Sequence, residues 1–125
     1  MGVQFENLVI NSGPLVCKVL GILPEDVLIA NTYFQTAGAR KRGCQIDYLI
    51  QTRFCCLYVC EVKFRQNVVG LEAVEEMKEK LMCLKLPRGF SCRPVLIHVN
   101  GVSEEVVDSG YFASIVDFSE LLKVE

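Results

Sequence analysis

The sequence reads GCQIDYLI at residues 43–50 and LYVCEVKF at residues 57–64. Over residues 45–51 polar and apolar side chains alternate, which predicts a strand with positions 46, 48 and 50 on one side and positions 45, 47 and 49 on the other. Residues 57–64 are an almost continuous β-prone run, which indicates a central strand buried on both faces. A three-residue turn through residues 53–55 would join the two strands in an antiparallel hairpin.

A helix and a strand are predicted before this hairpin. The helix covers residues 5–20, is interrupted near Pro14 and stops at Gly21, because proline suits a first helical turn and glycine a C-terminal cap. The β-prone run at residues 27–34 predicts the first strand. A polar, basic loop at residues 36–43 leads into the hairpin.

A second helix is predicted after the hairpin, from Leu71 to a point before Pro87, with Glu76 and Lys80 forming an i, i+4 pair on its exposed side. A short strand follows at residues 94–99, and Asn100-Gly101 marks a turn. Further on, we expect Ser103 to cap a short helix, and residues 115–122 to form a strand or helix packed on an edge. The order helix, three strands, helix, strand predicts an α/β fold with a mixed sheet and helices on its faces.

Composition favours a single intracellular domain. The 125 residues, half of them apolar, can bury one core but not two. No secretion signal and no run long enough to span a bilayer occurs, so we expect a soluble, cytoplasmic protein. The seven cysteines are odd in number and none are three residues apart, which indicates reduced, buried thiols rather than a disulfide framework or a zinc site.

Charge is unevenly distributed along the chain. The net charge is −2, but residues 36–65 carry six basic and two acidic residues, a balance of +4, which leaves −6 for the rest. This basic segment is what a phosphate-facing surface would require, and a solvated loop would look the same. The candidate phosphate contacts within it are Arg40, Lys41, Arg42 and Arg65.

Asp47, Glu61 and Lys63 are charged residues inside otherwise apolar strands. Burying such groups unpaired is costly, so each requires a partner, a metal or a wet cleft. In the predicted hairpin, Asp47 stands across from Glu61 with Cβ atoms ~5 Å apart, and Glu61 and Lys63 share a face. Two adjacent carboxylates would repel unless a hard divalent cation, Mg²⁺ or Mn²⁺, lay between them; the carbonyl of Val62 could add a ligand. Lys63 could then orient a water and counter charge on a phosphate.

These two strands resemble the signature of PD-(D/E)xK nuclease-like domains, and in particular the domains at the C-terminal end of certain bacterial and archaeal AAA-type ATPases. The resemblance implies a restriction-endonuclease-like core in αβββαβ order with a four-stranded mixed sheet. It also implies that Asp47 and Glu61 bind the metal, that Lys63 is the catalytic lysine, that Glu6 is an auxiliary acid, and that Gln45 lines the site.

Two functions from different classes follow. The first is a Mg²⁺-dependent endonuclease or exonuclease acting on DNA. The second is a catalytically inactive nuclease-fold module that associates with an ATPase partner, with the three charged residues forming a structural ion pair. Pairing of two copies through an exposed sheet edge or the apolar C-terminal tail is a further possibility. His98 is expected to be a satisfied strand histidine, and Cys60 to point away from Glu61 into the core.

Overall fold

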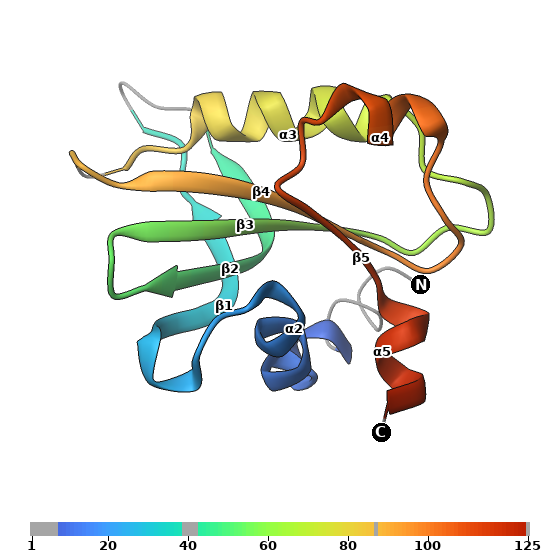
Figure 1. Cartoon of the computed structure of the whole chain (residues 1–125). Helices are drawn as coiled ribbons and strands as arrows, with labels where there is room; N and C mark the ends of the chain where they lie inside the picture. Colours follow the sequence, from blue (N-terminus) through green and yellow to red (C-terminus); the bar gives the residue numbers. More distant parts are fainter. Residues whose placement is uncertain (1–7, 39–42, 87, 125) are drawn as a thin grey trace.

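The computed structural model describes residues 8–38, 43–86 and 88–124. They form an α/β fold in which one mixed sheet is flanked by helices (Figure 1). The strands are β1 (Val27–Gln35), β2 (Cys44–Thr52), β3 (Cys56–Lys63), β4 (Ser91–His98) and β5 (Ser114–Asp117), and the helices are α2 (Gly13–Leu20), the 3-10 turn η1 (Pro24–Asp26), α3 (Glu72–Cys83), α4 (Glu104–Ser109) and α5 (Phe118–Val124). No helix in these ranges is long and apolar enough to cross a bilayer.

The sheet has strand order β1-β2-β3-β4-β5, so β3 is central, as its apolar sequence predicts. β1 pairs with β2 and β2 with β3 in antiparallel fashion, whereas β3, β4 and β5 run parallel. The prediction of four strands is wrong, because residues 114–117 add a fifth beside β4 before α5 begins. The tail is therefore both a strand and a helix, since a short edge strand and the helix after it can each bury one face.

Two apolar layers enclose the sheet (Figure 1). α2 and α5 cover one face, and we call the core there the lower core; its central members include Val16, Ile50, Ile97 and Phe118, all fully buried. α3 and α4 cover the other face, and we call the core there the upper core; it includes Ile46, Val59, Met77, Leu96 and Val106.

The hairpin of β2 and β3 forms as predicted. Its register runs from Thr52↔Cys56 to Tyr48↔Cys60, which leaves residues 53–55 as the loop. Cys55 ends this loop with φ 55°. A left-handed residue at the end of a three-residue loop is the usual way in which such hairpins close.

The predicted alternation along β2 fails at Ile46. The β1–β2 register shifts between Asn31 and Tyr33, whose partners are Leu49 and Ile46, so β2 carries one extra residue opposite Thr32. This bulge turns Ile46 into the upper core, whereas Tyr48 lies in the lower core. A bulge bends the strand and redirects its side chains, and this one includes the position of Asp47.

Helix boundaries follow the local signals in the sequence. Residues 8–11 are helical, the helix breaks at Ser12, and α2 starts again with proline in its first turn. α2 ends at Gly21, whose φ of 77° is the left-handed conformation that glycine adopts without strain. Ser103 caps α4 by accepting a hydrogen bond from the Val106 N–H, and Gly101 forms the predicted turn at φ 92°.

Candidate metal centre

Asp47 lies at the point where the regular pairing of β2 with β3 ends. Its side chain reaches toward β3, where Oδ2 accepts a hydrogen bond of 2.9 Å from the backbone N–H of Val62. Asp47 is buried, with 8% of its surface exposed. The bulge in β2 and this hydrogen bond together fix the carboxylate beside the neighbouring strand.

Glu61 is the most deeply buried charged residue of the site, with 3% of its surface exposed. Its Oε1 accepts a hydrogen bond of 2.8 Å from Lys80 Nζ, whereas its Oε2 accepts no hydrogen bond from any residue that the structure describes. Burial, followed by hydrogen-bond contact with the Asp47 carboxyl and the charge of Asp47, raises the pKa of Glu61 to about 7, against the opposing effect of Lys80. Two ionised carboxylates cannot donate to each other, so Oε2 needs a proton or a cation.

Lys63 projects on the same side of β3 as Glu61 and forms an ion pair with a residue of α3. Its Nζ donates to Glu76 Oε2 at 2.5 Å, and 15% of its side chain is exposed. Glu76 and Lys80 thus each pair with a residue of β3, and the prediction that they pair with each other on the exposed side of α3 is wrong. The buried charges of β3 need counterions. Glu76 and Lys80 can supply them because they flank the face of α3 that carries Met77 and packs on the sheet.

Lys80 is the residue of the site that the sequence pattern did not reveal. Burial alone would lower its pKa, but the hydrogen bond and charge of Glu61, with the charges of Asp47 and Glu76, outweigh burial and raise the pKa. One signal pointed to it: a glutamate inside a central strand requires a cation, and Lys80 lies one turn beyond the apolar Met77 on the helix that crosses this strand.

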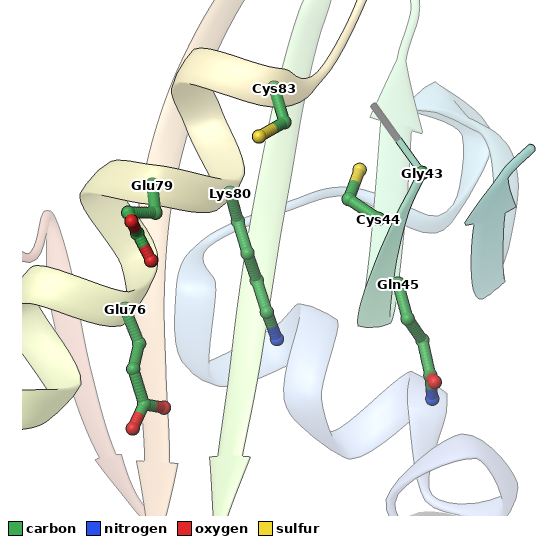
Figure 2. Close-up of a pocket in the computed structure, with 7 residues that line it drawn as sticks. All are labelled: Gly43, Cys44, Gln45, Glu76, Glu79, Lys80 and Cys83. Atoms are coloured by element: carbon green, nitrogen blue, oxygen red, sulfur yellow. The ribbon is translucent and has the colours of Figure 1, made fainter. Parts of the chain in front are cut away.

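An open pocket of about 330 Å³ lies beside this charge network. The start of β2 and the last turns of α3 form its walls, and Figure 2 shows Lys80 extending from α3 toward the sheet between them. Gln45 lines this pocket. The other lining residues are Gly43, Cys44, Glu76, Glu79 and Cys83.

Two carboxylates with one oxygen lacking a partner are a suitable donor set for Mg²⁺ or Mn²⁺. Mg²⁺ prefers hard oxygen ligands and is often held by one or two carboxylates, several waters and a substrate phosphate. Within the described ranges, no third His, Cys, Asp or Glu joins Asp47 and Glu61 in a metal-binding group. Glu6, the predicted auxiliary acid, lies outside the described residues. The Val62 carbonyl as a ligand stays a prediction.

The predicted phosphate contacts are only partly described. Arg40, Lys41 and Arg42 lie outside the described residues. Arg65 is partly exposed and donates to Glu72 Oε1 at 2.6 Å, so it is engaged with the first turn of α3. The outer surface of α3 and α4 is acidic, with exposed Glu72, Glu75, Glu104, Glu105 and Asp108. This outer surface therefore repels a polyanion.

Two further expectations concern residues near the site. His98 is buried and its Nδ1 accepts a hydrogen bond of 3.0 Å from the Gly101 N–H, which confirms a satisfied strand histidine. Cys60 packs in the lower core, away from Glu61, as predicted. All seven cysteines are free, but only Cys17 and Cys60 are buried, so the prediction of generally buried thiols is wrong.

Two solved structures share this fold. A repair endonuclease from Pyrococcus abyssi superposes with a TM-score of 0.57 at 15% identity, covering 94% of this chain and 46% of that protein. A protein of unknown function, AF1548, superposes with a TM-score of 0.62 at 16% identity, covering 90% of this chain and 64% of that protein. No family model and no curated protein matches the sequence. At these identities the likeness establishes a shared fold, over less than two thirds of either neighbour.

Proposed function

We propose that this chain is a metal-dependent nuclease domain that hydrolyses phosphodiester bonds of DNA, with a restriction-endonuclease-like core of the PD-(D/E)xK type. The observation that carries the proposal is the buried pair of Asp47 and Glu61, in which Glu61 Oε2 has no hydrogen-bond donor within the described part of the chain. A buried carboxylate oxygen of this kind is costly to keep ionised unless the site binds a cation. The fold shared with a repair endonuclease is consistent with this reading.

Asp47 and Glu61 would hold Mg²⁺ or Mn²⁺, which when bound would lower the pKa of a coordinated water and neutralise charge on the phosphate. The protein's own groups have separate tasks. The Val62 N–H fixes the orientation of Asp47. Lys63 supplies a positive charge on the same face as Glu61, where it can stabilise the negative charge that develops on a scissile phosphate. Glu76 holds that ammonium in position before the substrate binds.

The test is cleavage of supercoiled plasmid and of single-stranded DNA in Mn²⁺ or Mg²⁺, with EDTA as the blank. We expect Asp47→Asn and Lys63→Met to lower the cleavage rate by about 10²-fold or more, because each removes a charge that acts on the reacting phosphate. The matched control is Lys78→Met, which removes an exposed lysine of α3 that contacts Glu75. Cleavage that survives in Asp47→Asn would contradict the proposal.

A second candidate function is a catalytically inactive nuclease-fold module that docks on an ATPase partner. The observation that favours it is the completeness of the two ion pairs, Glu61 with Lys80 and Lys63 with Glu76, which satisfies most of the buried charge without a metal. This candidate predicts that neither the unaltered protein nor any variant cleaves DNA, and that Mn²⁺ does not raise the melting temperature.

A further inference from the structure

Lys80 occupies the position where a cation is needed. Its ammonium lies 2.8 Å from Oε1 of Glu61, a side chain that is 3% exposed. With Lys80 in place, the carboxylates of Asp47, Glu61 and Glu76 and the two lysines that face them sum to −1. Without Lys80 the same group would sum to −2. The ammonium therefore reduces the attraction of the site for any added cation.

The pocket offers the Lys80 side chain an alternative position. Its side chain is 27% exposed, and it lines the open pocket together with Glu76 and Glu79 of the same helix. Figure 2 shows the three side chains on the pocket side of α3. An ammonium that leaves Glu61 can therefore stay solvated and near carboxylates, so its release does not require the helix to move. Lys63 differs, because its ammonium is bound to Glu76 and not to Glu61.

We propose that Lys80 is a built-in counterion that competes with the divalent metal, so that metal binding exchanges the Lys80 ammonium for the metal at Glu61 and moves Lys80 into the pocket. This inference rests on the proposed metal-dependent function and adds a positioning residue to it. The exchange keeps Glu61 paired when no metal is bound. It also restricts loading to cations of high charge density, because a weakly bound cation would not displace a charge-assisted hydrogen bond.

The test is direct measurement of bound Mn²⁺ by electron paramagnetic resonance at pH 8.0 on the full chain. We expect Lys80→Met to bind Mn²⁺ about tenfold more tightly than the unaltered protein, because the lost charge-assisted hydrogen bond no longer opposes the metal. Lys80→Arg, which keeps the charge, should restore the original affinity. Lys78→Met is the matched control and should change the affinity by less than about threefold, because Lys78 is an exposed lysine of the same helix that contacts Glu75 and not Glu61.

The outcomes separate this inference from the proposed function. If Glu61→Gln abolishes Mn²⁺ binding and Lys80→Met leaves it unchanged or weaker, the metal site stands and the competing role of Lys80 is wrong. If neither the unaltered protein nor Lys80→Met binds Mn²⁺, both ideas fail. If Lys80→Met binds Mn²⁺ and the unaltered protein does not, the result supports competition between Lys80 and the metal. Circular dichroism checks that each variant is folded, and Lys80→Gln replaces Lys80→Met if that variant is not.

Discussion

The two faces of the sheet are built on opposite principles. Below the sheet, α2 and α5 close over a continuous apolar layer around Ile50, Ile97 and Phe118. Above it, α3 packs an equally apolar layer around Met77, but at the end near the start of β2 this layer gives way to buried charge: Asp47, Glu61 and Lys63 face Glu76 and Lys80.

The difference predicts that the two faces contribute differently to stability as pH and bound cations change. Apolar burial stabilises the fold at any pH, whereas buried carboxylates make stability depend on pH and on bound cations. Substitutions in the lower core should therefore reduce stability at every pH. Substitutions at the charged end should change the response to pH and metal.

The largest effect is expected in the lower core. Phe118 is fully buried and its ring lies 5.4 Å from that of Phe64. Phe118→Ala should lower the free energy of unfolding by about 3–5 kcal/mol, because it leaves a cavity between α5 and the sheet. Urea unfolding measures this, and Phe54→Ala, at a side chain that is 77% exposed, is the matched control and should cost less than about 0.5 kcal/mol. Equal losses of unfolding free energy in the two variants would contradict the stabilising role of the lower core.

The second prediction concerns pH at the charged end. The pKa of Glu61 is about 7 in the folded protein and near 4.3 when unfolded, so the folded state holds the proton more tightly. This stabilisation is complete below the unfolded pKa and is lost as pH rises through about 7. Relative to Glu61→Gln, the metal-free protein should therefore lose roughly 3 kcal/mol of unfolding free energy between pH 4 and pH 8.

Urea unfolding at both pH values, with EDTA present, provides the measurement. Glu79→Gln is the control, because it removes one exposed carboxylate of α3 and leaves the buried pair intact. A Glu61→Gln variant whose stability follows the same pH course as the unaltered protein would show that Glu61 is not held at a raised pKa.

A smaller effect is expected where α2 meets the sheet. A Cβ added at Gly13 would lie 2.6 Å from the hydroxyl oxygen of Tyr48. Gly13→Ala should therefore destabilise the protein by about 1–3 kcal/mol through overpacking. In a Tyr48→Phe background, which removes the clashing hydroxyl, the same substitution should be neutral or slightly stabilising, since alanine favours a helix over glycine by about 0.5–1 kcal/mol. A thermal-melt double-mutant cycle tests this, and additive effects would contradict the steric account.

The smallest effect compares two helix starts. The Ser103 hydroxyl accepts a hydrogen bond from the Val106 N–H, whereas Ser12, at the start of α2, makes no side-chain cap hydrogen bond. Ser103→Ala should cost about 1 kcal/mol, and Ser12→Ala distinctly less. Thermal melts of the two variants measure the two losses of stability. A larger loss in Ser12→Ala than in Ser103→Ala would contradict the role of the Ser103 hydroxyl as a cap.

Local patterns in the sequence predicted the fold well where neighbouring residues decide the conformation. The hairpin loop at residues 53–55, the end of α2 at Gly21 and the Ser103 cap all depend on a few adjacent residues. The sequence did not decide between a strand and a helix at residues 115–122, because a four-residue edge strand has little periodicity of its own. The fifth strand forms because β4 offers an open edge in parallel register.

By itself, the sequence determined that two acids and a lysine would lie in neighbouring strands, since strand alternation and a three-residue turn set their register. Only the tertiary structure decided how their charges are balanced. The bulge that redirects Ile46 depends on pairing with β1, and the ion pairs of Glu61 with Lys80 and of Lys63 with Glu76 depend on how α3 crosses the sheet. Such contacts join residues 13 and 19 positions apart, and they arise because a buried charge takes the partner that packing brings within reach.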